Sequence, residues 1–298
     1  MSKPSVAGIL GGIGGVDVGT HTFSVPSGAV AGEKLLLIIA AYAGTAGAAD
    51  FETPSGWSVG VMNFNEKITL SVFEKTSTGG ESTVALAGQG GTISYGYVLR
   101  VSEWADIEYA TVAEQGSSSS VNFITAPTVT PSWTEDTLYL VIGANGRSNQ
   151  LFDTPVTGYT SLAGVSGENA AGRGVGLIVG HKQGASATES PGDLTAGTYS
   201  NYNSVTIALK AAPAPVPTVT TTDTLQPGES FTLTATNYAS APVSPATFTD
   251  SEGSTITVPV TISGSGPYTA VGTMPTLAEA VTAGTSLLFG DVTIELST

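Results

Sequence analysis

Hydrophobic residues occur along the chain as short apolar runs and as alternating stretches. Two runs, at residues 35–39 and 138–142, are apolar at nearly every position, which is typical of strands buried on both faces. Other segments alternate apolar and polar residues and predict strands with one buried face. The segments are 68–73, 95–100, 175–179, 205–210, 231–235, 255–262 and 292–296. The pattern predicts an all-β protein.

The first 210 residues contain a weak internal sequence repeat, which we call the echo. Residues 23–26 (FSVP) recur as 123–127 (FITAP), and 51–57 (FETPSGW) recur as 152–159 (FDTPVTGY). Each half ends in an alternating strand. We therefore expect pseudo-repeats at about 17–115 and 120–210, whose matching apolar faces form one jelly-roll-like β-sandwich over 17–210. Residues 1–16 are expected to form an N-terminal arm.

A second domain is expected after the segment 211–217 (AAPAPVP), because alternating Pro and Ala cannot join a sheet ladder and favour an extended linker. Residues 218–298 contain short alternating strands separated by Gly-rich turns. About five to seven strands in a segment of this length predict a small immunoglobulin-like β-sandwich.

Charge narrows the classes of partner. The chain has 9 Lys and Arg against 24 Asp and Glu, a net charge of −15, and no basic residue follows Lys210. Nucleic acids and anionic membranes require clustered positive charge, so neither is expected as a partner. The chain has no cysteine, which excludes disulfides, thiol catalysis and cysteine-ligated metals. No membrane span is expected, because the longest apolar run, residues 35–43, is too short. No secretory signal is expected either, because the N-terminus lacks a strongly cationic start, a continuous apolar stretch and a small-x-small cleavage site.

One motif resembles the nucleophile elbow of hydrolases. Residues 56–60 (GWSVG) match G-x-S-x-G around Ser58, but the elbow requires a helix after the serine, and no helical periodicity follows. The only downstream histidine is His181. The echo explains Gly56 and Trp57 as a turn followed by an anchoring aromatic residue. His21 and His181 are too far apart in sequence to suggest a zinc site.

The remaining candidates have simpler explanations. Residues 250–255 (DSEGST) resemble half of a calcium loop but are typical of a hairpin turn. Residues 11–15 (GGIGG) lack the spacing of a phosphate-binding loop. Glu103, Asp106 and Glu108 are close only in sequence, so glycosidase chemistry has little support. The aromatic residues Trp57, Trp104, Trp133 and Tyr159 could stack against sugars, but core packing is the preferred role. We therefore predict no catalytic, cofactor-binding or metal site.

Residues 17–212 resemble a jelly-roll-like module of tailed-bacteriophage structural proteins. The resemblance rests on the turn at residues 26–33 (PSGAVAGE), the T-P-x-G-W turn at 53–57, and the final strand at 205–210. The Ala/Pro linker and the immunoglobulin-like tail are also similar to those of virion proteins. The resemblance implies a virion-surface or fibre protein, often a homotrimer, without catalytic residues. The segment 213–298 departs from it in having no basic residue.

We expect a phage virion structural protein that is not an enzyme, most simply a capsid decoration (cement or head-fibre) protein at the virion surface, assembled in the host cytoplasm. Its expected partners are its own copies in a homotrimer and the major capsid protein or other virion proteins. One alternative is a tail or fibre adhesin that binds host-surface carbohydrate. A more distant alternative is an extracellular β-sandwich polysaccharide-degrading enzyme.

Overall fold

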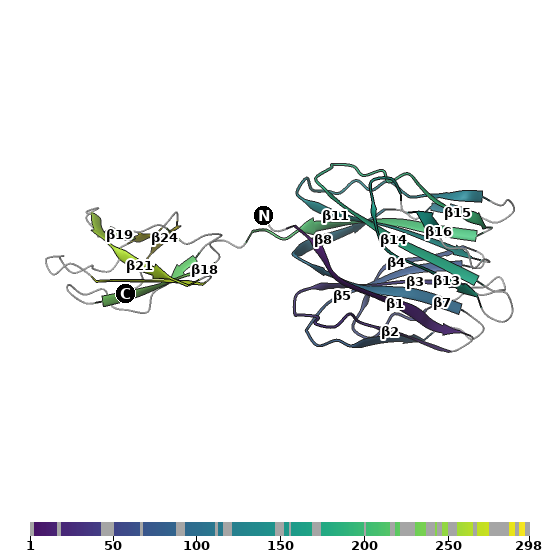
Figure 1. The fold of residues 1–298 in the computed structure, drawn as a ribbon, viewed down its shortest axis with the longest axis horizontal. Coiled ribbons are helices and arrows are strands. Elements are labelled where there is room, and N and C mark those ends of the chain that lie inside the picture. Colours follow the sequence, from purple (N-terminus) through teal and green to yellow (C-terminus); the bar gives the residue numbers. More distant parts are fainter. Residues whose placement is uncertain are drawn as a thin grey trace. The chain divides into compact units, whose positions relative to one another are not determined.

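The computed structural model describes residues 3–16, 19–42, 51–65, 68–87, 93–110, 113–115, 121–146, 152–154, 156–168, 174–199, 201–214, 218–220, 230–236, 242, 246–249, 255–264, 267–273, 286–289 and 292–295. Every regular element in these ranges is a β-strand, which confirms the predicted all-β class. The chain divides into two compact units, residues 1–213 and 214–298 (Figure 1).

The first half of unit 1 contains two antiparallel sheets. Its strands are β1 (Ser5–Val16), β2 (Thr20–Ser24), β3 (Lys34–Tyr42), β4 (Ser58–Asn65), β5 (Ile68–Thr76), β6 (Thr83–Ala87) and β7 (Ile93–Ser102). The large sheet has the order β1-β7-β3-β5-β4, and the small sheet pairs β2 with β6. The amide of Glu52 also donates to the carbonyl of Ala87, at the end of β6.

The second half repeats this arrangement. Its strands are β8 (Trp104–Tyr109), β9 (Ala113–Gln115), β10 (Val121–Thr125), β11 (Thr137–Gly146), β12 (Phe152–Thr154), β13 (Thr160–Glu168), β14 (Gly174–Gly184), β15 (Asp193–Tyr199) and β16 (Asn201–Ala211). The large sheet has the order β13-β14-β11-β16-β8, with β9 also on β16, and the small sheet has the order β10-β15-β12. Without β9, these eight strands in two sheets have a jelly-roll-like connectivity. If β8 is taken as the equivalent of β1, the large sheet read from β8 to β13 has the same strand order as the large sheet of the first half.

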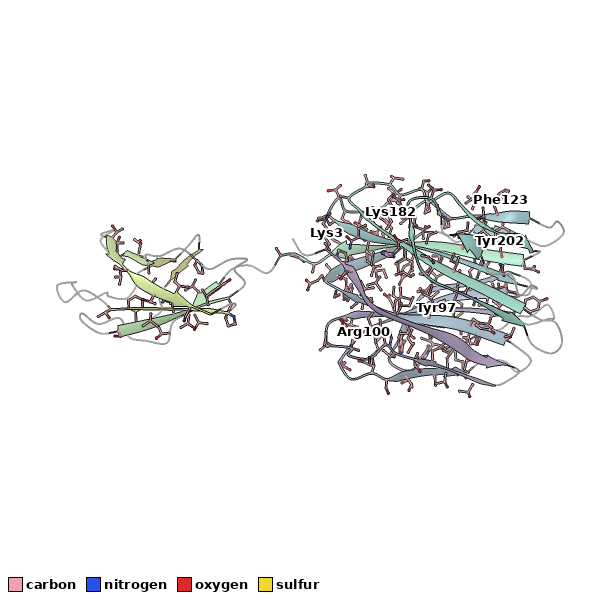
Figure 2. The ribbon with its side chains drawn as sticks, in the orientation of Figure 1. Lys3, Tyr97, Arg100, Phe123, Lys182 and Tyr202 are labelled. Atoms are coloured by element: carbon pink, nitrogen blue, oxygen red, sulfur yellow. The ribbon has the colours of Figure 1, made fainter. Side chains whose placement is uncertain are left out.

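The two halves pack as four layers. The inner faces of β3, β5 and β7 meet those of β11, β14 and β16 in one buried cluster. The outer face of each large sheet is covered by its own small sheet. Figure 1 shows β2 and β15 on opposite outer sides of the unit, and Figure 2 shows Tyr97 between the large sheets. The two half-sheets therefore pack on each other through their matching apolar faces, as expected. Each also carries its own small sheet, which was not expected, because strands that are apolar on both faces need cover on both sides.

The expected N-terminal arm is instead strand β1. It pairs antiparallel with β7 from Ser5↔Ser102 to Val16↔Ile93. The glycine-rich sequence permits this pairing, because a Cβ atom at Gly11 would lie 2.0 Å from the ring of Tyr97. The first repeat therefore starts at β1. The expected linker also begins later, because β16 extends to Ala211, whose amide donates to the carbonyl of Asp136 at 2.9 Å.

The phenylalanines of the echo are not equivalent in the structure. Val25 and Ala126 make matching hydrogen bonds to their small-sheet partners, which aligns the buried Phe23 with the buried Ile124. Phe123 then faces outward and is 49% exposed. A shift of one residue in a strand reverses the face of every side chain, so the following proline is the better guide to this alignment.

Unit 2 is an immunoglobulin-like sandwich. Its strands are β17 (Thr218–Thr220), β18 (Ser230–Thr236), β19 (Ala246–Thr249), β20 (Thr255–Val258), β21 (Val260–Ser263), β22 (Tyr268–Thr273), β23 (Ser286–Phe289) and β24 (Val292–Glu295). The sheets have the orders β17-β18-β22-β21 and β20-β19-β23-β24. With the strands lettered A, B, C, C′, D, E, F and G, these are the ABED and C′CFG sheets of that fold.

Candidate functional site

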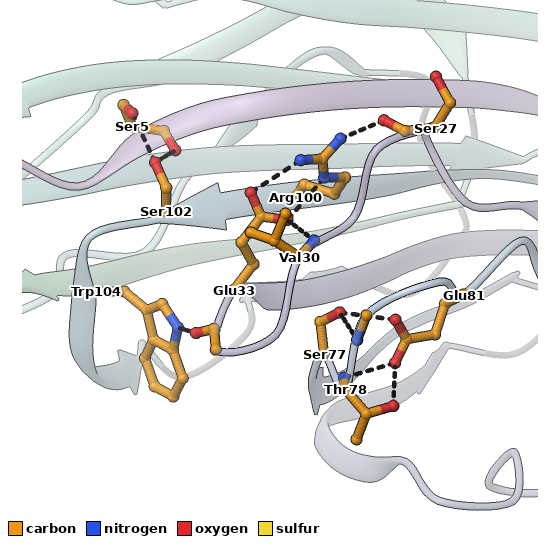
Figure 3. Close-up of polar contacts among 12 residues, drawn as sticks. Ser5, Ser27, Val30, Glu33, Ser77, Thr78, Glu81, Arg100, Ser102 and Trp104 are labelled. Carbon is orange, nitrogen blue, oxygen red and sulfur yellow. Dashed lines mark hydrogen bonds and ion pairs between the residues drawn. The ribbon is translucent and has the colours of Figure 1, made fainter.

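A buried ion pair lies at one end of the first large sheet. The Arg100 guanidinium donates from Nε to Oε2 of Glu33 at 2.8 Å and from Nη2 to Oε1 at 2.9 Å, while its Nη1 donates to the carbonyl of Ser27 (Figure 3). Both side chains are less than one tenth exposed. The hydrogen bonds from Arg100 hold the pKa of Glu33 below its usual value of 4.5. Arg100 thus ties the turn before β3 to β7.

Trp104 closes the same end of the sheet. Its indole Nε1 donates to the carbonyl of Gly32 at 2.8 Å (Figure 3), and the Lys34 ammonium lies 3.9 Å from the ring centroid. Lys34 also forms an ion pair with Glu74 at 3.0 Å. Because Trp104 is the first residue of β8, this contact joins the second half to the turn of the first.

A carboxylate–cation pair recurs at the same place in the second half. Leu36 pairs with Leu99, and Leu138 pairs with Leu209, so Glu135 and Lys210 are the equivalents of Glu33 and Arg100. Lys210 Nζ lies 2.9 Å from Oε1 of Glu135, but the two side chains are 29% and 43% exposed. The second half therefore keeps the pair in a solvent-exposed form.

Every described Lys and Arg side chain of unit 1 is neutralised by a carboxylate of the same chain. The six pairs are Lys3–Asp136, Lys34–Glu74, Lys75–Glu81, Arg100–Glu33, Lys182–Glu189 and Lys210–Glu135. Glu189 also accepts from the buried Tyr159 hydroxyl at 3.2 Å. Because each of these bases already has an acidic partner, they offer an outside partner little unpaired positive charge.

The structure does not assemble a nucleophile elbow at Ser58. Residues 54–57 form a turn, in which the amide of Trp57 donates to the carbonyl of Pro54 at 3.0 Å. Gly56 has a φ of 77° there. Strand β4 follows directly, and Ser58 is an exposed residue at its start, paired with Glu74. His181 lies on β14 of the other large sheet, paired with Leu140 and Thr160.

Sequence reasoning missed a buried histidine–serine contact. The His21 ring, fully buried, has Nδ1 2.5 Å from the hydroxyl oxygen of Ser94, and it meets the Phe51 ring edge-on at 5.1 Å. His21 lies in a small-sheet strand with alternating burial. That alternation was the available signal, since it places His21 and Phe23 on the same inward face. The contact joins the small and large sheets of the first half.

The other candidate groups are distributed rather than assembled. Asp106 accepts from the amide of Ile107, and Glu108 accepts from the amide and hydroxyl of Ser132. The four aromatic residues pack against three different clusters, Trp57 in the first half, Trp104 between the large sheets, and Trp133 with Tyr159 in the second half. They form no single stacking platform. Residues 11–15 belong to β1, and residues 250–254 lie outside the described residues.

An apolar row is exposed on strand β4. Val59, Met62 and Phe64 are 45%, 40% and 39% exposed. They pair with Phe73, Ser71 and Thr69 of β5, which places all three on the outer face of the large sheet. We call these three residues the β4 row. β4 is the last strand of its sheet, and among the described residues only β5 pairs with it. The apolar runs at residues 35–39 and 138–142, by contrast, are fully buried within one chain.

The described residues contain no group of three or more His, Cys, Asp or Glu side chains that could hold a metal ion. Among them there is also no helix with the length and apolarity that crossing a bilayer requires. No family model, curated protein or solved structure matches the chain.

Proposed function

We propose that this chain is a structural protein of a phage virion, most simply a capsid decoration protein whose unit 1 attaches to the particle. The observation that carries the proposal is a duplicated jelly-roll-like body whose six described bases are each paired with an acid of the same chain. Jelly rolls are a recurrent architecture of viral capsid proteins. Bases that are already paired within the chain favour attachment by packing over attachment by charge.

The location of all nine bases before residue 211 suggests anchoring through complementary charge. However, the six described bases are each paired with an acid. In the proposal unit 1 binds through apolar surface. Unit 2 follows the Ala/Pro-rich segment, has seven acidic and no basic residues over 213–298, and is dispensable for attachment.

A second candidate function, a tail or fibre adhesin for host-surface carbohydrate, is favoured by one face of unit 2. The face of β18, β21 and β22 that points away from the core carries eight hydroxyl side chains and one valine, without a charge. The residues are Ser230, Thr232, Thr234, Thr236, Thr261, Ser263, Thr269, Val271 and Thr273. Hydroxyl groups both donate and accept hydrogen bonds, as sugar hydroxyls do.

The test is attachment to particles that lack the protein. We expect the full chain and a chain ending at Pro213 to bind with similar affinity, and residues 214–298 alone not to bind. Imaging of particles carrying a C-terminal label then distinguishes capsid from tail. Binding by residues 214–298 alone, or a label confined to the tail, would contradict the decoration proposal, and in the latter case the adhesin takes its place.

A further inference from the structure

The two halves of unit 1 provide an internal comparison for the β4 row. Ser71 pairs with Ile39 in the first half, and Gly180 pairs with Val141 in the second. Met62 pairs with Ser71, and Ser161 with Gly180, so Met62 and Ser161 are equivalent.

The same registers make Phe64 equivalent to Gly164, because their partners Thr69 and Ile178 pair with Ala41 and Gly143. Both Ser161 and Gly164 are exposed. At the equivalent edge of the second half the chain thus has a serine and a glycine, whereas β4 has a methionine and a phenylalanine there. The fold itself does not require apolar residues at these positions.

The backbone of β4 is suited to strand pairing. Natural sheet edges are usually protected by charged side chains, prolines or bulges. β4 contains no charge and no proline, and its register shift lies between Val59 and Val61. The following residues 61–65 pair regularly with β5. This part of the strand presents an uninterrupted edge beside two exposed apolar side chains.

The net charge of the chain indicates which partner can bind this edge. A partner that recognised this protein by complementary charge would bind its acidic surface, because the chain has a net charge of −15. Two copies of such a chain repel one another wherever their acids meet, and they approach most easily where the surface is uncharged. β4 itself, Ser58–Asn65, contains no charged residue.

We propose that β4 pairs antiparallel with β4 of a second copy about a two-fold axis, joining two five-stranded sheets into one continuous sheet. Antiparallel pairing about an axis perpendicular to the sheet keeps outer faces together, so the two β4 rows meet side by side. The interface is isologous, because the same residues contribute from both copies. The proposal does not depend on a virion location, and it replaces the expected homotrimer with a dimer.

The experiment measures the mass of the full-length chain by sedimentation equilibrium from about 1 µM to about 1 mM, the range of weak strand-mediated contacts. The wild type is expected to pass from monomer to dimer. Met62→Ser combined with Phe64→Ser, which gives β4 the polarity of β13, should weaken the dimer at least about tenfold. Met62→Lys, a charge at the edge, should do the same. Raising salt from about 0.15 M to about 1 M should tighten the wild-type dimer, because it shortens the screening length from about 8 Å to about 3 Å.

The matched control is Phe123→Ser, which removes an even more exposed aromatic residue from β10 and should leave the dimer intact. Thermal unfolding of each variant checks that the fold is retained. Three results would overturn the proposal: a wild type that stays monomeric at all concentrations, a wild type with the mass of a trimer, or β4 variants that associate as tightly as the wild type. Weakening by Phe123→Ser equal to that by the β4 variants would also contradict it.

Discussion

The two halves of unit 1 share a strand order, but they differ in the burial of the ion pair at the end of each large sheet. In the first half, Glu33 and Arg100 form a two-point ion pair that is almost completely buried. In the second half, Glu135 and Lys210 form a single contact in solvent. The position of the pair at the sheet end is common to both halves, whereas its burial differs. Because burial decides what an ion pair contributes, equivalent residues have different roles in stability.

The halves also differ in how they fill the space between small and large sheets. A Cβ atom at Gly96 would lie 2.7 Å from the Phe23 ring and 2.9 Å from the carbonyl oxygen of Ile38. Gly96 pairs with Ile39 and Thr206 pairs with Val141, so Gly96 and Thr206 are equivalent. The second half thus has a smaller residue on its small sheet, Ile124 in place of Phe23, and a larger residue on its large sheet, Thr206 in place of Gly96. Close packing tolerates such an exchange when total volume is kept.

The largest expected effect is at the buried ion pair. Arg100→Met leaves the Glu33 carboxylate buried without its partner and should lower the free energy of unfolding by about 3–5 kcal/mol. The matched change Lys210→Met, at the exposed pair, should have a much smaller effect. Denaturant unfolding of unit 1 measures both. The double variant Arg100→Met/Glu33→Met should recover most of the loss, and equal losses for the two single variants would contradict this comparison.

The same pair should make stability depend on pH. The folded-state pKa of Glu33 is lowered by its hydrogen bonds with Arg100, so its stabilising contribution is complete above pH 4.5 and is lost as the pH falls below that value. Unfolding measured between pH 6 and about pH 3 should show a smaller decrease for Glu33→Gln than for the wild type. Parallel curves for the two proteins would show that Glu33 does not carry this dependence.

Gly96→Ala should lower the free energy of unfolding by about 1–3 kcal/mol, because the added methyl group meets both a ring and a backbone oxygen. Gly164→Ala is the control, since a Cβ atom there has nothing within 4 Å, and it should leave stability unchanged or slightly higher. Thermal melting of both variants provides the measurement. If Gly96→Ala left the free energy of unfolding unchanged, the small and large sheets of the first half would have to move apart easily at this point.

The smallest effect is expected on β16. The buried hydroxyl of Thr206 has no hydrogen-bond partner in the described part of the chain, so Thr206→Val should raise stability by up to about 1 kcal/mol. Ser204, two residues earlier, donates to the carbonyl of Thr125 at 2.9 Å, and Ser204→Ala should lower stability by about 1 kcal/mol. Urea midpoints measured for both variants should therefore shift in opposite directions.

Sequence patterns were reliable where the signal was local. Apolar runs and alternation predicted the strands, and the run at 35–39 indicated burial on both faces, since these signals depend on neighbouring residues alone. The echo indicated a duplication because similar short segments recur about one hundred residues apart. The same patterns misplaced residues 1–16. A glycine-rich segment has little side-chain signal, and its strand conformation depends on pairing with β7, about ninety residues away.

By itself the sequence determined the all-β class, the duplication, the immunoglobulin-like pattern of the second unit and the absence of cysteine chemistry. Only the tertiary structure decided which partner each apolar face has, because that depends on contacts between strands far apart in the chain. It also decided that the pairing partner of Arg100 is Glu33, 67 residues away, and that Phe64 is exposed while Phe73 is buried. Alternation defines two faces of a strand, but only the position of that strand in its sheet determines whether either face is covered.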